Sequence, residues 1–381
     1  MAVYLGVDLH VRTQTVCWLD RADGEEHQIT LDHERDDVAA FYAQFASPAT
    51  VGVEASGYSL WFHRLVESLG HSLLVGDALA IRQFARRRQK NDRRDAQLLL
   101  DLLLHGDFPA VHIPSPSSRD VLALLRYRHR LVRIRTMLRN GLQAVALSHR
   151  LRLGPKLFTP AGLQQLAVLP LTGAFAIQRQ HSLALLAALA EQILAVEQAL
   201  EARAQNDPRV LRLRTHPGVG RLTSLAVVHV LDPVSRFDRA RRVAAYCGLD
   251  PREHSSGDAQ RFGHISKQGN RLLRFLLVEA AHNAIRGDQD LRRFYFHLQA
   301  RKNSSVAIVA VARKLVLRLY RMLRDQIDYD QFRRRGRDAR RAREVTSQAV
   351  LTDSLMGPSA CPAPRRTERS RPHEPRARID E

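Results

Sequence analysis

The chain has 381 residues, of which 45% are hydrophobic, so its length allows two or three domains with packed cores. It carries 59 Lys and Arg against 39 Asp and Glu, a net charge of +20 that points to a polyanionic partner and suits a small-molecule kinase poorly. We expect no membrane span and no signal peptide, because no apolar run reaches about 18 residues. Three scattered cysteines, Cys17, Cys247 and Cys361, form neither a disulfide framework nor a zinc pattern. A reducing, cytoplasmic setting follows.

The first 115 residues alternate between strand and helix patterns. Three short strands joined by tight turns come first and predict an antiparallel meander. Helices and strands then alternate, which predicts parallel crossovers. The strands are expected at 2–9, 13–19, 27–31, 50–54 and 71–75, and the helices near 35–45 and 58–69. This order predicts a mixed α/β sheet of the ribonuclease H type over residues 1–115.

Four acidic residues stand in or beside apolar runs of this segment: Asp8, Glu54, Asp92 and Asp95. A buried carboxylate is costly unless it is hydrogen-bonded, paired or bound to a metal. Asp92 and Asp95 are three residues apart in a helical pattern, so they share one face. Mg²⁺ prefers such oxygen ligands, with Mn²⁺ as the alternative, and such sites cut phosphodiesters in ribonuclease H-like nucleases and recombinases. The alternative is that some of the 39 acids lie near strand ends by chance.

A basic segment leads directly into the Asp92/Asp95 pair and is a candidate phosphate-binding surface. Its residues are Arg86, Arg87, Arg88, Lys90, Arg93 and Arg94. The alternative reading is the solvated face of a surface helix.

Residues 116–206 show two long amphipathic helix patterns, at 117–150 and 182–205. Together they predict an antiparallel hairpin or coiled-coil arm, a kind of element that joins protomers or grips nucleic acid. The stretch 151–180 is rich in Gly and Pro and is expected to be a connection.

Residues 207–330 predict a mainly α-helical C-terminal domain. The motif HPGVG separates two apolar helical segments and resembles a helix-hairpin-helix, with Gly218 and Gly220 placed to contact phosphate. An ordinary turn between helices is the alternative. Further helices are expected at 266–285 and 305–323, and residues 331–381 are expected to form a basic disordered tail.

A polar loop in this domain carries Ser255 and Ser256 before the helix at 266. A serine becomes a nucleophile only with a nearby base, cation or metal. Arg261, Lys267 and Arg271 could supply positive charge around a phosphate there. A serine in a loop is also an ordinary turn residue.

Six motifs, GVDLH, VGVEASG, NDRRDA, HPGVG, AAYCGLDPREHSSG and GHISKQGNRLLRFLLVEAA, occur in this order. Together they resemble the DEDD-type transposases of insertion sequences related to the Piv DNA invertase, over about residues 3–325. That family joins an N-terminal RuvC-like domain to a C-terminal transposase domain. The metal-binding acids of the family match Asp8, Glu54, Asp92 and Asp95, and its nucleophilic serine best matches Ser256, with Ser255 as the alternative. Asn91 stands where relatives commonly carry Thr.

The resemblance implies a transposase and site-specific recombinase that cuts and rejoins DNA with Mg²⁺. It also implies guidance by an element-encoded structured RNA, a homo-oligomer (dimer or tetramer) in which acids and serine meet across protomers, and a nucleoid-associated prokaryotic setting. An alternative is a RuvC-like nuclease or junction resolvase that uses metal-activated water and does not need Ser256. Another is a nucleic-acid-binding protein whose acids are structural. The run VYLGVDLH is also similar to the first phosphate loop of the sugar-kinase and actin fold, but no later Gly-rich loops accompany it.

Overall fold

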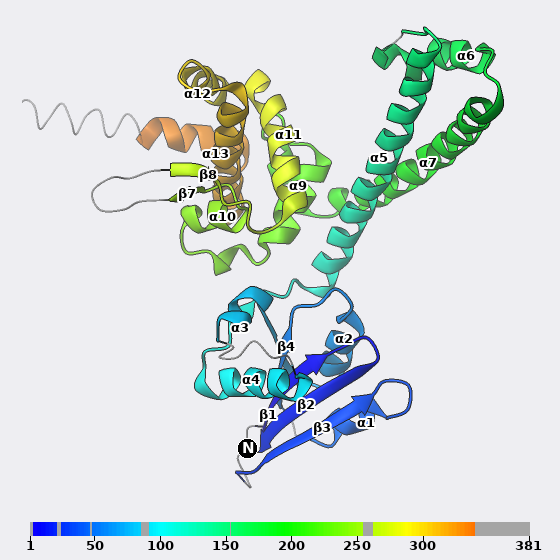
Figure 1. The fold of residues 1–381 in the computed structure, drawn as a ribbon. Coiled ribbons are helices and arrows are strands. Elements are labelled where there is room, and N and C mark those ends of the chain that lie inside the picture. Colours follow the sequence, from blue (N-terminus) through cyan, green and yellow to red (C-terminus); the bar gives the residue numbers. More distant parts are fainter. Residues whose placement is uncertain are drawn as a thin grey trace, which may run out of the picture. The chain divides into compact units, whose positions relative to one another are not determined.

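The computed structural model describes residues 3–20, 24–45, 48–84, 91–152, 154–253 and 262–339. The chain divides into two compact units, Met1–Pro116 and Ser117–Glu381 (Figure 1). Each unit has its own hydrophobic core.

The N-terminal unit is built on a six-stranded sheet of order β3-β2-β1-β4-β5-β6. The strands are β1 (Val3–Leu9), β2 (Thr13–Asp20), β3 (Glu26–Asp32), β4 (Thr50–Glu54), β5 (Ser72–Gly76) and β6 (Ala110–Val111). β1 is antiparallel to β2 but parallel to β4, and β4 is parallel to β5. The predicted mixed sheet is therefore confirmed, and it is consistent with a ribonuclease H-like domain.

Helices cover both faces of this sheet, and the strand alternation decides which residues face which helix. The helices are α1 (Val38–Ala43), α2 (Leu60–Ser68), α3 (Ala78–Phe84) and α4 (Asp92–His105). Leu5 and Val7 of β1 share a core with Tyr42 of α1 and Phe62 of α2. On the opposite face, Cys17 of β2 packs with residues of α4. The even-numbered positions of β1, Asp8 among them, therefore face α4.

The C-terminal unit begins with a long helical arm. It contains α5 (Pro116–Ser148), a 3₁₀ turn (Gly154–Phe158), α6 (Pro160–Val168) and α7 (Gly173–Gln205). Arg203 of α7 pairs with Asp120 at 2.8 Å, and Glu197 pairs with Arg128 at 2.5 Å, so the two long helices run antiparallel. The predicted hairpin is confirmed.

Residues 151–180 were expected to be only a connection, and that expectation is wrong. The stretch contains α6, and α7 begins at Gly173, nine residues earlier than predicted. Gly173 adopts φ +56° and Pro160 occupies the first position of α6, so here Gly and Pro start helices. Leu157 and Leu166 are buried against Leu142 and Ala146 of α5, which closes the tip of the arm.

One helix differs from the expectation that no segment is long and apolar enough to span a membrane. A window of α7 is long and apolar enough to cross a membrane by length and composition alone, with a mean hydropathy of 1.6 and 17% of its residues buried. Alanine and leucine dominate this stretch, and both raise hydropathy in an ordinary helix. This is weak evidence for a membrane span.

The remaining helices pack around α13 (Ser304–Arg324), ten of whose residues are buried. They are α8 (Pro208–Arg214), α9 (Arg221–Leu231), α10 (Ala240–Tyr246), α11 (Arg271–Gly287) and α12 (Gln289–Gln299), with a 3₁₀ turn (Val234–Arg236) and a ribbon of β7 (Pro251–Glu253) and β8 (Phe262–Ile265). α11 starts five residues later than predicted because Asn270 caps it, accepting a hydrogen bond from Leu273 N.

The prediction of a disordered tail from residue 331 onward is wrong for residues 331–339. Residues 329–339 are helical. Tyr329 is buried and Phe332 packs against the core, so two aromatic residues hold the start of this segment. Residues 340–381 lie outside the described part of the chain.

Candidate active site

Two neighbouring parallel strands carry Asp8 and Glu54 to the same edge of the sheet. Val7 of β1 pairs with Val53 of β4, so the next residue on each strand is one of the two acids. Val7 and Val53 both face the α1/α2 core. Because side chains alternate along a strand, Asp8 and Glu54 both lie on the face that α4 covers.

Gly6 sets how closely α4 approaches β1. A Cβ atom at Gly6 would lie 2.4 Å from Ala96 O and 2.4 Å from Leu100 N, so the helix backbone lies directly on the strand. The same contact places the first turn of α4, with Asp92 and Asp95, beside the end of β1. Asn91 caps this helix by accepting a hydrogen bond from Arg93 N at 3.1 Å.

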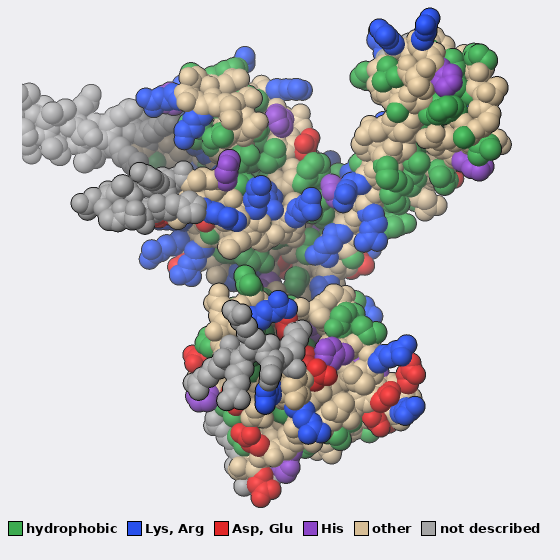
Figure 2. All heavy atoms as spheres, viewed as in Figure 1, with side chains coloured by type: hydrophobic (Ala, Val, Ile, Leu, Met, Phe, Trp, Pro, Cys, Tyr) green, Lys and Arg blue, Asp and Glu red, His purple; other side chains and the backbone are tan. Residues whose placement is uncertain are grey.

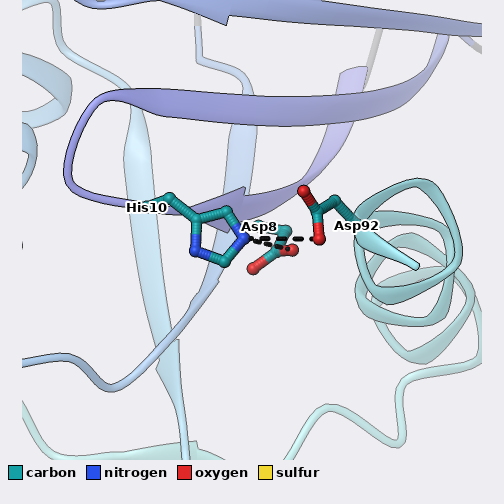
Figure 3. Close-up of side chains that lie close together, drawn as sticks. All are labelled: Asp8, His10 and Asp92. Atoms are coloured by element: carbon teal, nitrogen blue, oxygen red, sulfur yellow. Dashed lines mark ion pairs between the residues drawn. The ribbon is translucent and has the colours of Figure 1, made fainter. Parts of the chain in front are cut away.

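Asp8, His10 and Asp92 form a group whose potential ligand atoms all lie within 4.8 Å of one another (Figure 3). His10 Nε2 is 3.2 Å from Asp8 Oδ2 and 3.5 Å from Asp92 Oδ1. The Asp8 side chain is 15% exposed, that of His10 45% and that of Asp92 61%. Asp8 is thus the most buried member of the group, and Asp92 is the most exposed.

The electrostatics of this group favour a cation. Burial raises the pKa of Asp8 above its usual value; Asp95 and Asp92 raise it further, while His10 lowers it. Asp8 Oδ2 and His10 Nε2 are both shielded from solvent and neither makes a hydrogen bond of good geometry. A divalent cation could bind both of these atoms, which otherwise face only each other at 3.2 Å, and would offset the repulsion between the carboxylates. The residues present fit a metal site.

His10 was missed by the sequence analysis, although GVDLH contained a signal for it. Residues two apart along a strand lie on the same side, so His10 follows Asp8 to the same edge. Glu54 and Asp95 were predicted as ligands but are outside the group within 4.8 Å among the described residues. Asp95 is still close enough to influence the pKa of Asp8.

Several predicted residues lie outside the described part of the chain. These are Ser255, Ser256, Arg261, Arg86, Arg87, Arg88 and Lys90. The serines fall between β7 and β8, which pair antiparallel. Arg93 and Arg94 are exposed on the first turn of α4, next to Asp92.

The HPGVG motif forms the turn between α8 and α9. Gly218 has φ +82°, and a Cβ atom there would lie 2.3 Å from Ala284 N of α11. Packing against α11 therefore requires a glycine at position 218. This structural role is separate from the phosphate contact predicted for Gly218. Gly220 is the N-cap of α9 and makes no side-chain capping bond, which leaves the first turn of α9 without such a partner.

Comparison with known proteins agrees with this arrangement. Residues 5–149 match a model of DEDD transposases of IS110 elements, described as "Transposase", and residues 210–296 match the "Transposase IS116/IS110/IS902 family". A "Probable family 20 transposase" of Pseudomonas aeruginosa is 29% identical over 85% of this chain and 98% of its own length. The transposase for insertion sequence element IS1111A of Coxiella burnetii is 28% identical over 85% of this chain and 90% of its own.

The sheet, its acidic edge and these matches define the class: an insertion-sequence transposase, which cleaves and transfers DNA. The chain carries the DEDD transposase domain and the second transposase domain of the IS110/IS116 family. The DEDD match implies dependence on a divalent metal, and the Asp8–His10–Asp92 group is where the described residues could hold one.

Proposed function

We propose that this transposase is a site-specific recombinase that cuts and rejoins DNA through a serine nucleophile, assisted by a divalent metal at the acidic edge of the sheet. The single observation that carries the proposal is the Asp8–His10–Asp92 group, which combines two carboxylates, a neighbouring third in Asp95 and two solvent-shielded atoms without hydrogen bonds. The motif resemblance supplies the assignment of the serine.

Asp8 and Asp92 would hold the metal, with Glu54 and Asp95 completing the ligand set as the DEDD resemblance implies. Mg²⁺, or Mn²⁺ in its place, would polarise the phosphoryl group and stabilise charge on the leaving oxygen. Arg93 and Arg94, exposed beside Asp92, would bring a DNA phosphate toward this edge.

Ser256 is proposed as the nucleophile, with Ser255 as the alternative. Its hydroxyl oxygen bonds to phosphorus and its proton leaves, while the bond from phosphorus to a deoxyribose oxygen breaks and that oxygen gains a proton. Attack of a strand-end hydroxyl on the phosphoserine reverses the step and rejoins DNA. Arg261, Lys267 and Arg271 would bind the phosphate.

The acids and the serine lie in separate units of the chain. Following the resemblance, we propose that they meet across protomers of a homo-oligomer, with the α5–α7 arm serving assembly. An element-encoded RNA would select the DNA by base pairing. Action on chromosomal DNA places the protein in the cytoplasm.

The test is a covalent-adduct assay. Wild type, Ser256→Ala, Ser255→Ala and Asp92→Asn are each incubated with the native element's DNA, co-expressed RNA and Mg²⁺. Asp107→Asn is the control for Asp92→Asn, because Asp107 is exposed just beyond α4. The expected result is a denaturant-resistant protein–DNA adduct that Ser256→Ala and Asp92→Asn abolish.

Cleavage without an adduct, retained in Ser256→Ala and lost in Asp92→Asn, would instead assign a metal-dependent nuclease of the RuvC type. Cleavage and adduct unaffected by Asp92→Asn would show that the acidic edge is structural.

A further inference from the structure

A large basic groove lies within the C-terminal unit, away from the acidic edge in sequence. Its volume is about 1480 Å³. Its walls come from residues 126–140 of α5, from the start of α9 and from residues 271–283 of α11, with Glu201 of α7 and Arg214 of α8 beside them. Figure 2 shows Lys and Arg side chains gathered on the surface between the positions of α9 and α5.

Six arginines line this groove, and they divide into two groups. Three share two carboxylates: Arg128 pairs with Glu197 at 2.5 Å, and Arg214 and Arg221 pair with Glu201 at 3.1 and 2.9 Å. The other three, Arg126, Arg133 and Arg271, are exposed. Within the described ranges, no carboxylate lies within 4.0 Å of those three. They keep their full charge for an anion from outside.

Two of the unpaired arginines, Arg133 and Arg271, lie near an aromatic pair. Phe275 of α11 is 44% exposed, and its ring centroid lies 5.0 Å from that of His129 of α5. Arg271 is one helical turn before Phe275. Burial lowers the pKa of His129, and Arg133, Arg128 and Arg271 lower it further, so these cations lie close to the ring. The uncharged rings of Phe275 and His129 therefore lie close to several cations.

The start of α9 adds backbone donors to the same groove. Gly220, Arg221 and Thr223 line it, and Gly220 caps α9 without a side-chain hydrogen bond. N–H groups of an uncapped first turn favour a negatively charged ligand. The start of α9 therefore adds to the attraction of the groove for anions, which comes mainly from the arginines.

We infer that this groove binds a single-stranded stretch of DNA, with phosphates on Arg126 and Arg133 and a base stacked on Phe275. The choice of DNA rests on the proposed action on DNA. The single strand is favoured because every base stacks on an aromatic ring once it is unpaired, whereas bases inside a duplex are already stacked. An exposed phenylalanine would contribute little to binding an intact duplex.

The test measures binding alone. Fluorescence anisotropy of the full chain, in EDTA and without added RNA, compares a labelled single-stranded DNA oligonucleotide with its duplex and with RNA of the same sequence. The variants are Phe275→Ala, Phe275→Trp and Arg133→Gln. The matched controls are Phe296→Ala, an exposed Phe on α12 outside the groove, and Arg241→Gln, an exposed Arg on α10.

We expect wild type to prefer the single strand over its duplex. Phe275→Ala should weaken single-strand binding by about 5- to 150-fold, since stacking on one aromatic residue contributes about 1–3 kcal/mol per base. Phe275→Trp should restore it. Arg133→Gln should lower the slope of log affinity against log salt by about 0.7. The two controls should match wild type.

Duplex binding as tight as single-strand binding, or no loss in Phe275→Ala when its circular dichroism matches wild type, would overturn the inference. A preference for the RNA strand above tenfold that depends on Phe275 would overturn the assignment to DNA. Failure of the adduct assay leaves this result intact, and an unchanged Phe275→Ala leaves the serine mechanism intact, so the two proposals fail separately.

Discussion

At the level of single residues, His10 changes the chemistry expected at the acidic edge. Four carboxylates alone would form an all-oxygen site of the kind Mg²⁺ prefers. His10 Nε2, 3.2 Å from Asp8 Oδ2, adds a nitrogen, which transition metals accept more readily than Mg²⁺ does. The preference between Mg²⁺ and Mn²⁺ at the proposed site should therefore depend on His10, which was not among the predicted ligands.

His10→Ala should weaken Mn²⁺ binding by about tenfold, a typical loss for a group that supports a metal site, and weaken Mg²⁺ binding less. Isothermal titration calorimetry with each metal measures this. His105→Ala is the control, because His105 is exposed at the other end of α4. Equal Mn²⁺ affinity in His10→Ala and wild type would remove His10 from the site.

Asn91, which stands where the family resemblance predicts Thr, has a clear local role. It caps α4 through its side-chain oxygen, and Thr can do the same. Asn91→Thr should leave the free energy of unfolding nearly unchanged, whereas Asn91→Ala should lower it by about 1 kcal/mol. Urea denaturation followed by circular dichroism compares the three proteins. A loss in Asn91→Thr as large as in Asn91→Ala would mean that capping is not what Asn91 provides.

At the level of elements, the contact between β1 and α4 determines the site. Asp8 belongs to the strand and Asp92 to the helix, and their distance depends on how closely the two backbones approach. That approach depends on the missing side chain of Gly6, where a Cβ would lie 2.4 Å from two backbone atoms of α4.

Gly6→Ala should push α4 away from β1, destabilise the N-terminal unit by about 1–3 kcal/mol and weaken metal binding. Thermal unfolding and calorimetry with Mn²⁺ test the two effects. Gly57→Ala is the control, since a Cβ at Gly57 meets nothing within 4 Å. Unchanged metal affinity in a folded Gly6→Ala protein would show that the site tolerates a displaced helix.

At the level of the whole molecule, a buried polar cluster joins segments of the C-terminal unit that are far apart in sequence. Asp288, 2% exposed, caps α12 and accepts hydrogen bonds from Tyr329 Oη at 2.6 Å and from Arg318 of α13. His216 of the HPGVG turn lies 3.8 Å from the same carboxylate. The hydrogen bonds and Arg318 hold the pKa of Asp288 below its usual value despite its burial, which by itself raises it.

Asp288→Ala should lower the free energy of unfolding by about 3–5 kcal/mol, because it removes the close partner of the buried Arg318 and leaves only Asp290, 4.0 Å away. Asp290→Ala, which removes a 41% exposed carboxylate two residues later, should cost under about 1 kcal/mol. Chemical denaturation measures both. Similar losses in the two variants would show that the buried Asp288–Arg318 pair contributes no more to stability than an exposed carboxylate does.

The same cluster should make stability depend on pH. Burial lowers the pKa of His216 from 6.5 to about 4, so the folded protein keeps this ring neutral where the unfolded chain binds a proton. Stability should therefore fall as pH drops from about 6.5 to about 4, by about 3 kcal/mol from this group. The stability that Asp288 contributes is lost only when the pH falls below 3.8, the usual pKa of an aspartate.

Urea midpoints measured across this range for wild type and His216→Gln test the expectation. The variant should show a shallower dependence on pH. An identical slope in both proteins would assign the acid sensitivity to other groups, among them His229, whose pKa is also lowered by burial.

Features that depend on local pattern could be predicted from the sequence. Alternating and helical periodicities fixed the strands β1 to β5 and the long helices α5 and α13 to within a few residues, because each element buries one face of its own. Asp8, Glu54 and the Asp92/Asp95 pair were recognisable because carboxylates in apolar runs need a partner. Strand alternation also predicts that His10 lies on the same side of β1 as Asp8.

Features that depend on contacts between distant segments are visible only in the folded protein. The clearance at Gly6 brings Asp92 to Asp8, and the core beneath Tyr329 and Phe332 extends the fold past the expected end. The groove around Phe275 arises only where α5, α9 and α11 meet. Local sequence records which face of an element is apolar but not which partner covers it, so these distances follow from packing and not from pattern.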